Sequence, residues 1–400
     1  MLDALGITWP LASVSGYGIY GLEIAQSFFR QGGKKLALTQ APLALALPPP
    51  LESRLAPCLA LAEKFAAAIK NDPQELFRFD FPVLHGVGND FKGFPGQDQV
   101  RGAPNIGCAA IEHLFCSPHG REVAGSYDFL VAISEFNADY LRSLNAAPVH
   151  LCHQGIDRDA FFPQAKRGLW PGRFAIFSGG KFEFRKGQDI VLAAFKRFAA
   201  RYPEALLVCA WQSLSASDPA AFQAAGHIQD TPRAVAGGLD IAGWLLRQGL
   251  RSDQFIALPF THQLLMPAVL RECDAAIFPN RCEGGTNLVA MEAAACGIPV
   301  YAAANSGQID LIKYCGVQAL TRQTPCAAPA DPRLTTAGWG ESDIEEIIAA
   351  LTAIYHDPQG ARAAMTGVAA RIRDWDWHTQ NTKLFAAVTP SQPFAAKIAS

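Results

Sequence analysis

Short apolar segments alternate along the chain with segments of helical periodicity, a pattern typical of doubly wound α/β sheets. The apolar segments predict buried strands that run parallel to one another. In the first half of the chain the pattern predicts strands at residues 36–39, 83–85, 129–134 and 149–152, and helices at residues 59–69 and 137–143. In the second half it predicts strands at residues 174–178, 206–210, 255–258, 275–278 and 300–303, and a helix at residues 189–202.

The chain is long enough for two domains, because 400 residues with 50% apolar content can bury two sizeable cores. Residues 163–173 are polar and rich in turn formers, so we expect the interdomain linker there. The predicted domains therefore cover residues 1–165 and 166–378. Residues 213–243 give no clear pattern and are expected to form a helix-containing insertion with mobile loops.

Composition excludes some function classes. A formal net charge of −2 gives no electrostatic basis for binding nucleic acid. The ten cysteines have no regular spacing, which is typical of reduced cysteines used as small apolar residues. The N-terminal region lacks the pattern of a signal peptide, and the apolar residues 41–51 are too few to span a bilayer. We expect a cytoplasmic protein, and the basic residues Arg30, Lys34 and Lys35 leave a peripheral contact with the inner membrane face open.

The most informative segment runs from Phe278 to Val300 and reads FPNRCEGGTNLVAMEAAACGIPV. Two carboxylates, Glu283 and Glu292, lie at either end of a glycine-led loop that enters an apolar segment of helical character. The loop residues permit a tight turn and a cap for the helix, and the exposed N–H groups at such a helix start favour phosphate. The loop residues concerned are Gly284, Gly285, Thr286, Asn287 and Leu288, of which Thr286 or Asn287 can be the cap. Glu292, one to two turns into the helix, can accept two hydrogen bonds from ribose hydroxyls.

A second segment, residues 174–187, combines a predicted strand with glycines and basic residues. Gly179 and Gly180 follow the strand, and Lys181 and Lys186 lie five residues apart. Two ammonium groups at the end of a strand can neutralise a departing diphosphate. Arg185 is interpreted as a solvated charge.

These two segments resemble motifs of the retaining glycosyltransferases of family 4, which have the GT-B fold. In that family a strand ends in G-R-x4-K-G, and this chain has Gly180, Lys181, Lys186 and Gly187 at the same spacing, with lysine in place of arginine. The carboxylate motif of the family is E-x7-E followed by A-x-A-C-G-x-P-V, and residues 292–300 match its second half. Glu283 departs from the pattern, since it precedes Glu292 by nine residues where the family usually has eight.

Further matches follow in the expected order along the chain. They are residues 15–21 (a glycine-rich loop after the first strand), 127–141 (strand, serine and helix), 153–163 (the domain junction) and 375–377 (the aromatic entry to a closing helix). The resemblance therefore implies a C-terminal helix or tail at residues 379–400 that packs back toward the N-terminal domain.

The resemblance implies a GT-B protein, with two Rossmann-like, doubly wound parallel-sheet domains facing an interdomain cleft. It implies a hexosyltransferase that moves a sugar from a nucleotide sugar to an acceptor hydroxyl with retention, without a cofactor or metal. We expect UDP-sugar in preference to GDP- or ADP-sugar. The acceptor is expected to be a sugar, a lipid-linked molecule or another small molecule.

Ligands of open α/β sheets bind at the carboxyl ends of strands, so the loops after these strands are expected to meet around one cleft. The expected donor-binding residues are Gly16, Gly18, Lys181, Lys186, Gly284, Gly285, Thr286, Asn287, Leu288 and Glu292. The expected catalytic residues are His85, Glu283, Lys181 and Lys186.

The sugar contact in the first domain has two candidates. His85 is expected to end a strand ahead of glycines, with Asn89 and Asp90 nearby, and to contact the donor sugar. His113 competes with it from a setting that we interpret as helical, where packing is the alternative role.

Other activities stay open at this point. A phosphorylase, a nucleotide-sugar hydrolase or an epimerase can share the same fold and phosphate site. A catalytically silent nucleotide-sugar-binding protein is the alternative from a different class, and the shifted Glu283 is the feature that favours it.

Overall fold

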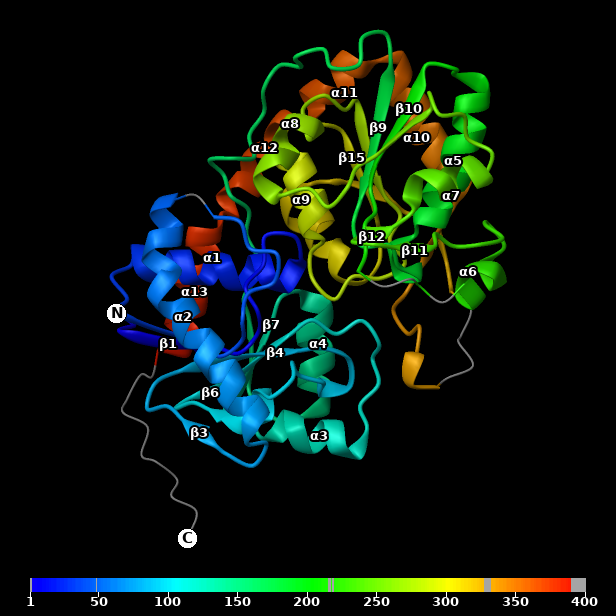
Figure 1. The fold of residues 1–400 in the computed structure, drawn as a ribbon. Helices are drawn as coiled ribbons and strands as arrows, with labels where there is room; N and C mark the ends of the chain where they lie inside the picture. Colours follow the sequence, from blue (N-terminus) through cyan, green and yellow to red (C-terminus); the bar gives the residue numbers. More distant parts are fainter. Residues whose placement is uncertain (1, 48, 215–216, 218, 327–331, 390–400) are drawn as a thin grey trace. The chain divides into compact units, whose positions relative to one another are not determined.

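The computed structural model describes residues 2–47, 49–214, 217, 219–326 and 332–389, and these form two compact units (Figure 1). The first unit comprises the chain up to Gly155 and resumes at Trp377, and the second unit runs from Ile156 to Asp376. The second unit is thus an insertion between two parts of the first.

The first unit is built on a parallel sheet with the strand order β2-β1-β4-β6-β7-β8. Its strands are β1 (Ala4–Ile7), β2 (Lys35–Leu38), β4 (Val83–Val87), β6 (Asn105–Ala109), β7 (Phe129–Ala132) and β8 (Val149–Leu151), with a small pair β3 (Phe77–Arg78) and β5 (Val100–Arg101). Its helices are α1 (Gly16–Arg30), α2 (Pro49–Asn71), α3 (Pro118–Gly125), α4 (Glu135–Leu144) and α13 (Trp377–Val388), with short 3-10 turns at η1 (Asn89–Phe91) and η2 (Gln97–Gln99).

Helix α13 returns the chain to the first unit by packing against α1. The rings of Phe28 and Phe385 lie 6.4 Å apart, centroid to centroid. The side chain of Asn381 donates to the carbonyl oxygen of Glu23 (3.0 Å) and to Ser27 Oγ (2.9 Å). This buried amide fixes the orientation of α13 against α1.

The second unit is built on a parallel sheet with the strand order β13-β10-β9-β14-β15-β16. Its strands are β9 (Phe174–Gly179), β10 (Ala205–Ala210), β13 (Phe255–Ala257), β14 (Ala275–Phe278), β15 (Val300–Ala303) and β16 (Gln318–Leu320). Counted along the chain this is the order 3-2-1-4-5-6 of dinucleotide-binding sheets, whose ligands bind where the order reverses. The reversal lies between β9 and β14, which pair at Ala275 with Ile176.

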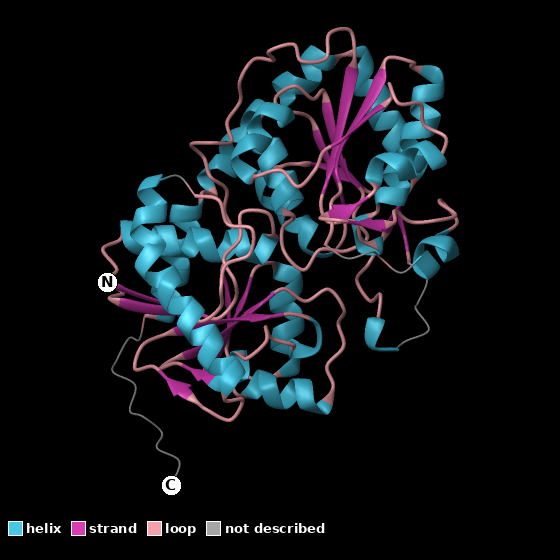
Figure 2. Cartoon of the chain, in the orientation of Figure 1, coloured by secondary structure: helices cyan, strands magenta, loops and turns pink. Residues whose placement is uncertain are grey.

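Helices cover both faces of this second sheet, as Figures 1 and 2 show. They are α5 (Gln188–Arg201), α6 (Pro219–Ala225), α7 (Ile241–Arg247), α8 (Met266–Leu270), α9 (Leu288–Ala295), α10 (Ile344–His356), α11 (Pro358–Ala364) and α12 (Thr366–Asp374). Small two-stranded pairs are β11 (Ala234–Val235) with β12 (Gly238–Leu239) and β17 (Gln323–Thr324) with β18 (Glu341–Ser342), and short turns are η3 (Phe184–Lys186), η4 (Gln263–Leu265), η5 (Ser306–Gln308), η6 (Leu311–Cys315) and η7 (Pro332–Leu334).

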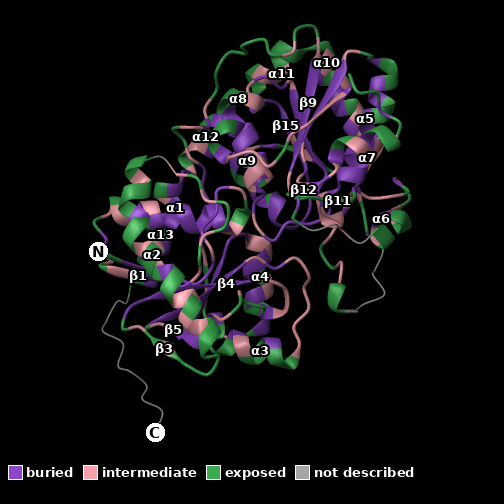
Figure 3. Ribbon diagram, viewed as in Figure 1, coloured by how far each residue is buried: buried purple, intermediate pink, exposed green. Residues whose placement is uncertain are grey.

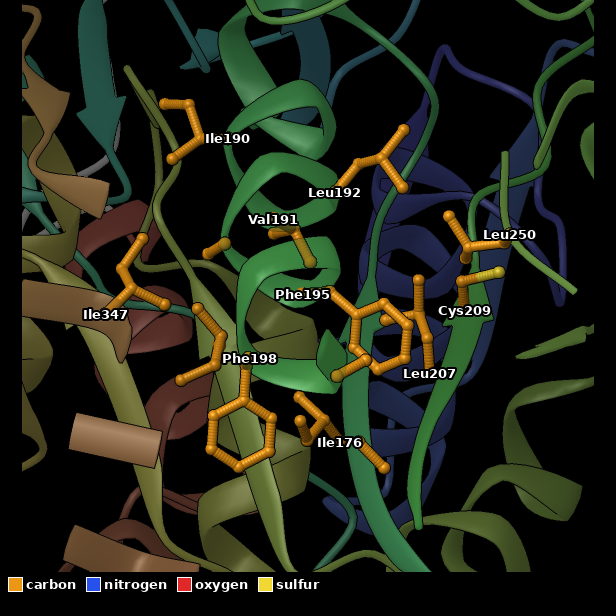
Figure 4. Close-up of a cluster of buried hydrophobic side chains, with 14 of the residues drawn as sticks. Ile176, Ile190, Val191, Leu192, Phe195, Phe198, Leu207, Cys209, Leu250 and Ile347 are labelled. Atoms are coloured by element: carbon orange, nitrogen blue, oxygen red, sulfur yellow. The ribbon is translucent and has the colours of Figure 1, made fainter. Parts of the chain in front are cut away.

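Two apolar cores hold these helices to the sheet. On one face, α5, α7 and α10 pack over β9 and β10, and Figure 4 shows Phe195 of α5 close to Leu207 and Cys209. On the other face, α8, α9 and α12 cover residues such as Ala276 and Val300. The inner strands β9, β10, β14 and β15 are buried along most of their length, while the edge strands β13 and β16 are partly exposed. The outward sides of the helices are exposed (Figure 3). Burial on both faces explains why these strands are continuous apolar runs in the sequence.

The parallel sheets confirm the predicted fold class, and every predicted strand has a counterpart in the structure. The structure adds β6, which the sequence did not predict because Gly102, Pro104 and Gly107 interrupt its apolar pattern. The helix predicted at residues 59–69 extends over Pro49–Asn71. The predicted insertion at residues 213–243 contains α6 and the start of α7, and its residues 215–216 and 218 lie outside the described residues.

The structure divides the chain at Gly155, ten residues before the boundary expected after residue 165. Residues 156–165 belong with the second unit, because Phe161 is fully buried in its core and Arg271 Nη2 donates to the carbonyl oxygen of Ala160 (2.7 Å). The segment expected as a linker, residues 163–173, is pinned to the same unit. There the Glu272 carboxylate accepts from the backbone N–H groups of Gly168 (2.8 Å) and Leu169 (2.9 Å). The expected tail at residues 379–400 corresponds up to Thr389 to α13 and its end, and residues 390–400 lie outside the described residues.

Candidate functional site

The loops after β9 and β14 meet at the carboxyl edge of the second sheet, at the reversal of strand order. The first loop contains Lys181 and Lys186, and the second contains Glu283 and leads into α9. Their backbones touch, since the Cys282 N–H donates to the carbonyl oxygen of Arg185 (3.2 Å). The structure therefore brings together the two segments that the sequence singled out.

Two glycines shape the first loop. Gly180 has φ +123° and Gly187 has φ +67°, both in the region that favours glycine. A Cβ at position 187 would also lie 2.5 Å from the carbonyl oxygen of Pro279, so only glycine lets the start of α5 approach the end of β14. The Gln188 side chain then donates to the carbonyl oxygens of Gly180 (3.3 Å) and Lys181 (2.9 Å), which holds the loop in place.

The second loop ends in a capped helix. Asn287, at φ +64°, is the N-cap of α9, and its side-chain oxygen accepts from the Ala290 N–H (3.3 Å). Asn287 is therefore the cap, and the alternative, Thr286, points its hydroxyl to the Met291 sulfur (3.1 Å). Gly297, at φ +76°, follows α9 at its other end, in the left-handed conformation that commonly ends a helix.

A neighbouring turn supports the glycine loop from behind. The Glu283 N–H donates to Ser306 Oγ (2.8 Å), and the Gly307 N–H donates to the carbonyl oxygen of Glu283 (3.0 Å). A Cβ at position 307 would lie 2.1 Å from the carbonyl oxygen of Gly285, so the two backbones are in direct contact. The position of Glu283 is thus set by the residues around it.

The Glu283 carboxylate pairs with two cations of the first loop. Lys186 Nζ lies 2.5 Å from Oε1, and Arg185 Nη1 lies 3.1 Å from Oε2. The Asn280 side chain also donates to Oε1. Burial by itself would raise the pKa of Glu283, but Lys186 and Arg185 outweigh it and hold that pKa below its ordinary value. Glu283 is therefore ionised and buried inside a cluster of cations.

Arg185 corrects one interpretation from the sequence. The sequence suggests a solvated charge, but the Arg185 guanidinium contacts both Glu283 (3.1 Å) and Glu183 (3.0 Å) and is mostly buried. The sequence hid this because the partner Glu283 lies 98 residues away. Lys181 is the more exposed cation, and its Nζ lies 2.5 Å from Glu183 Oε1.

A fully buried ion pair fastens the two loops to α5. Arg281 donates to both carboxylate oxygens of Asp189, at 2.8 and 2.7 Å, and both side chains are 0% exposed. Arg281 also donates to the carbonyl oxygen of Phe184 (2.8 Å) and to Glu341 Oε2 (2.8 Å). Lys186, Arg185 and Glu283 together form what we call the anion cluster. Since Arg281 and Phe184 adjoin these residues in the chain, the Arg281–Asp189 pair holds the cluster in register.

Glu292 lies within α9 and is buried. The Gln263 side chain, on η4, donates to its Oε1 (2.5 Å). Burial raises the pKa of Glu292 to about 8, and the Gln263 hydrogen bond only partly opposes this effect. The environment of Glu292 therefore favours the protonated, neutral carboxyl.

The first unit places His85 within its sheet. Its Nε2 lies 2.7 Å from Asn105 Oδ1, its Nδ1 lies 3.4 Å from Thr8 Oγ1, and the residue is 1% exposed. Burial lowers the pKa of His85 to about 4, so the ring is neutral. The strand was expected to end at His85, but β4 continues to Val87, which buries the ring. These contacts indicate that His85 packs within the sheet. They do not support the catalytic role expected for His85, which stays a prediction.

His113 lies in a loop after β6, so the helical setting expected for it is wrong. The backbone N–H groups of Glu112 (2.8 Å) and His113 (3.0 Å) donate to Asn89 Oδ1, and the Ser117 N–H donates to Asp90 Oδ1 (2.8 Å). This loop therefore lies at the carboxyl ends of β4 and β6, where ligands of such sheets bind.

Gly16 and Gly18 lie at the start of α1, which Ser15 caps through the Gly18 N–H (3.3 Å). A Cβ at Gly18 would lie 2.3 Å from Ala12 Cβ, so Gly18 permits close packing of α1. Position 16 has open space around it. Of the two, Gly16 is the residue that leaves room for a ligand.

Among the residues that the structure describes, no group of three or more His, Cys, Asp and Glu side chains could hold a metal ion. Nor does any described helix have the length and apolar character needed to traverse a bilayer.

The model of the family "Family 4 Glycosyltransferase in conflict systems" matches residues 121–384, about two thirds of the chain. The chain belongs to this family of glycosyltransferases. The match includes the whole second unit, with both loops of the anion cluster. The expected family and the expected transferase class are therefore confirmed.

Curated relatives of this glycosyltransferase include two mycobacterial enzyme types. It is 24% identical over 311 residues to a GDP-mannose-dependent alpha-(1-6)-phosphatidylinositol monomannoside mannosyltransferase of Mycolicibacterium smegmatis, covering 69% of this chain and 70% of that one. It is 31% identical over 196 residues to a D-inositol 3-phosphate glycosyltransferase of a Mycobacterium species (strain KMS). That alignment covers 47% of this chain and 39% of the relative, so the chain spans well under half of the relative's length.

Solved structures confirm the GT-B fold. Sucrose-phosphate synthase from Thermosynechococcus elongatus has a TM-score of 0.63 at 17% identity, with 96% of this chain and 98% of that one covered. A trehalose-phosphate synthase (UDP-forming) from Burkholderia vietnamiensis has a TM-score of 0.59 at 14% identity, covering 99% and 98%. Anabaena HepE, in complex with UDP and glucose, has a TM-score of 0.58 at 13% identity, covering 96% and 99%.

The sequence did not assign several residues that position the site of this glycosyltransferase. Asp189 and Arg281 are 92 residues apart in the chain, and an acidic residue in a first helical turn is ordinary, so their pairing left no local signal. Asn280 and Gln263 also lack a motif. Ser306 has a positive φ of 44°, which no residue pattern in the sequence predicts.

Proposed function

We propose that this glycosyltransferase moves a hexosyl group from a nucleotide-sugar donor to an acceptor hydroxyl, with retention at the anomeric carbon and without a metal ion. The observation that carries the proposal is the meeting of Lys186, Arg185 and Glu283 beside the start of α9, at the strand-order reversal of the second sheet. This edge of the sheet suits a diphosphate, because the edge offers cations, the start of a helix and glycine backbone N–H groups together.

The donor diphosphate would lie between Lys181, Lys186 and the backbone N–H groups of residues 284–288. When the glycosidic C1–O bond breaks, both electrons leave with the diphosphate oxygen, and these cations and N–H groups neutralise the charge that develops. The acceptor oxygen then bonds to C1 on the same face, and its proton passes to the departing diphosphate. Since the lysines supply the neutralisation that a divalent ion can supply elsewhere, the proposal needs no metal.

Glu292 would accept two hydrogen bonds from the donor ribose. Its carboxyl is buried beside Gln263 and needs a strong partner when ionised. Two hydroxyl donors would favour the charged form, so ribose binding should release a proton from Glu292 at neutral pH. Glu292→Gln should weaken donor binding by about tenfold or more and slow transfer, since hydrogen bonds to a charged group contribute roughly 1.5–3 kcal/mol. Equal donor affinity and turnover in wild type and variant would remove the ribose assignment.

Glu283 would hold Lys186 in place and contact a sugar hydroxyl. Its described partners are Lys186, Asn280 and Arg185, three donors for a carboxylate that has roughly four lone-pair sites. The remaining capacity can accept one hydroxyl. The longer spacing to Glu292 does not prevent this, because Ser306 and Gly307 fix the Glu283 backbone.

We favour UDP as the nucleotide of the donor, in line with the UDP bound in the Anabaena neighbour. The name of the Mycolicibacterium relative specifies GDP-mannose instead. The names of the curated relatives specify inositol-containing acceptors, so a small polyol or a lipid-linked sugar is the proposed acceptor class. The reaction would take place in the cytoplasm, at the inner membrane face if the acceptor is lipid-linked.

The test is a thermal-shift panel with UDP, GDP, ADP and their sugar conjugates. A ligand at a hundred times its Kd should stabilise the native state by about 2.7 kcal/mol, a shift of a few degrees. One nucleotide should stabilise the wild type, and Lys186→Ala should abolish most of this shift. Lys196→Ala removes an exposed lysine of the same unit and should leave the shift intact. A shift with inorganic phosphate but with none of the nucleotides would favour a phosphorylase instead.

A further inference from the structure

Glu183 lies among the cations of the proposed diphosphate site. Its Oε1 is 2.5 Å from Lys181 Nζ, and its Oε2 is 3.0 Å from Arg185 Nε. The Arg185 guanidinium continues to Glu283, and Glu283 continues to Lys186. Three cations and two carboxylates thus alternate in one chain of ion pairs, with a net charge of +1 (three positive minus two negative).

The two carboxylates of this chain are held very differently. Glu283 is fixed by the Asn280 side chain, and its backbone is fixed by Ser306 and Gly307. Glu183 precedes η3, and its side chain does not cap that turn. Its Oε2 is buried but accepts no well-directed hydrogen bond from the described residues, although the Arg185 cation is adjacent. A buried acceptor without a good donor costs free energy, so Glu183 is the carboxylate that can leave.

If Glu183 moved away, its two partners Lys181 and Arg185 could bind an anionic ligand. Arg185 would keep Glu283 and the carbonyl oxygen of Cys282 (3.4 Å) as partners. The Lys181 side chain is 54% exposed and can turn toward a ligand. The cations pull the pKa of Glu183 below its ordinary value although burial opposes them, so the residue is a charged competitor for anions.

We propose that Glu183 is an internal anion that occupies Lys181 and Arg185 in the unliganded enzyme and is displaced by the donor diphosphate. This inference rests on the proposed function and deepens it, because it adds Arg185 to the diphosphate site and makes Glu183 a determinant of donor affinity. Without Glu183 the chain of ion pairs would carry a net charge of +2 (three positive minus one negative). A diphosphate would then bind without first replacing a carboxylate.

The same exchange assists release of the product. After transfer the nucleoside diphosphate must leave a site that contains three cations, and the return of Glu183 to Lys181 and Arg185 supplies the competing charge. Glu183 thus weakens the binding of both donor and product. Removal of its charge should lower KM and should lower kcat wherever product release limits turnover.

The experiment compares four proteins by calorimetry with the nucleoside diphosphate and monophosphate of the base that the wild type binds. Glu183→Gln should bind the diphosphate about three- to thirtyfold more tightly, because it removes one charge repulsion close to the ligand. Arg185→Gln should bind it about tenfold or more weakly, because it removes a charge-assisted contact. Glu345→Gln alters a well-exposed carboxylate of the same unit and should match the wild type.

A second measurement, of monophosphate affinity, distinguishes competition by Glu183 for the cations from a role in which Glu183 only positions them. If Glu183 competes with phosphate charge, the gain in Glu183→Gln should be larger for the diphosphate than for the monophosphate, and steady-state KM should fall in that variant. Unchanged or weaker diphosphate binding by Glu183→Gln overturns the inference while the proposed function stands. Absence of any nucleotide binding by the wild type overturns the proposed function, and the inference with it.

Discussion

Glu292 and His85 are both buried, and burial shifts their pKa values in opposite directions. Each shift favours the neutral form of the side chain, a protonated carboxyl at Glu292 and an unprotonated imidazole at His85. Both residues were predicted to lie at the site, yet only Glu292 lies in the unit that contains the anion cluster. Their titrations offer separate tests of the two units.

Glu292 should make the wild type less stable as pH rises. Its pKa is about 8 in the folded protein against 4.5 ordinarily, so the folded state keeps a proton that the unfolded state releases. This stabilisation is complete below pH 4.5 and is lost as pH rises through 8. Glu292→Gln does not lose this contribution, so the free energy of unfolding of the variant should gain roughly 4 kcal/mol on that of the wild type between about pH 5 and pH 9. Urea unfolding at both pH values measures the gain.

The matched control for this prediction is Glu345→Gln, at an exposed carboxylate of the same unit. Its unfolding curve should parallel that of the wild type at both pH values. A constant difference between Glu292→Gln and the wild type across the range would show that Glu292 ionises normally.

His85 should make the first unit less stable as pH falls. Its pKa is about 4 in the folded protein against 6.5 ordinarily, so the unfolded state binds a proton that the folded state does not. Stability from this residue is present above pH 6.5 and is lost as pH falls toward 4. As pH falls over this range, His85→Gln should lose less free energy of unfolding than the wild type, by roughly 3 kcal/mol. His119→Gln, at an exposed histidine, should keep the wild-type slope, and equal slopes in all three proteins would refute the prediction.

Residue identity predicted chemistry better than it predicted surroundings. The strand-end motifs located Lys186, Glu283 and Glu292 because glycines and carboxylates at such positions carry a local signal. The motifs could not reveal that Arg185 and Glu283 pair, since the contact joins positions 98 residues apart. Nor could they place His85 inside the sheet, because two more residues of strand after His85 decide its burial.

At the scale of elements, one ion pair connects α5 to the loop that follows β14. Arg281 and Asp189 are both 0% exposed and bond through two parallel hydrogen bonds, so neither charge can be solvated if its partner is lost. Glu341, whose pKa the His227 hydrogen bond and Arg281 lower to about 2 against the effect of burial, extends the contact to β18. The anion cluster therefore depends on a support that itself touches no ligand in the proposed mechanism.

Breaking this pair should destabilise the second unit strongly. Arg281→Met leaves Asp189 buried without a partner, and such changes cost about 3–5 kcal/mol in denaturant unfolding. The double variant Arg281→Met with Asp189→Leu removes both charges and should recover most of the stability. If the pair positions the loops, the double variant should bind nucleotide more weakly than the wild type even though its stability has recovered. Full recovery of binding along with stability would reduce the pair to a packing role.

The control for this prediction is a surface pair. Arg322 and Asp343 lie 3.2 Å apart but are well exposed, so Arg322→Met should cost less than about 1 kcal/mol and leave nucleotide binding unchanged.

Element prediction succeeded where burial on both faces gives a continuous apolar run. Strands β9, β10, β13, β14 and β15 and helix α5 were predicted nearly at their observed bounds. Strand β6 was missed because its residues, NIGCA, lie among glycines and prolines, and its pairing with β4 and β7 overrides that weak local preference. Helix α3 was missed for a similar reason, since it is short and contains two glycines.

At the scale of the molecule, every residue of the proposed donor diphosphate and ribose contacts lies in the second unit. We therefore expect the fragment 156–376 to fold by itself and to bind the nucleotide that the whole chain binds, as measured by circular dichroism and calorimetry. The fragment 166–376, cut at the boundary expected from the sequence, lacks the fully buried Ile156 and Phe161. Loss of two such side chains should cost roughly 3–6 kcal/mol. Equal stability of the two fragments would contradict the observed boundary.

The boundary illustrates what composition cannot predict. Residues 163–173 have the turn-rich composition of a linker, yet Glu272 and the ion pair of Lys166 with Asp274 fasten this stretch to the second unit. Only contacts between distant positions decide which unit a polar segment joins.

The chain enters and leaves the second unit at paired positions. Ile156 forms a β-bridge with Asp376, and its N–H donates to the carbonyl oxygen of Trp375 (3.0 Å). Because the two ends of the segment meet, the segment can be replaced by a homologous one through two junctions in the chain. Both junctions then lie at the bridge between Ile156 and Asp376. Natural recombination or deliberate grafting could thus give this protein a new donor preference while its β1–β8 sheet and closing helix α13 keep their own sequence.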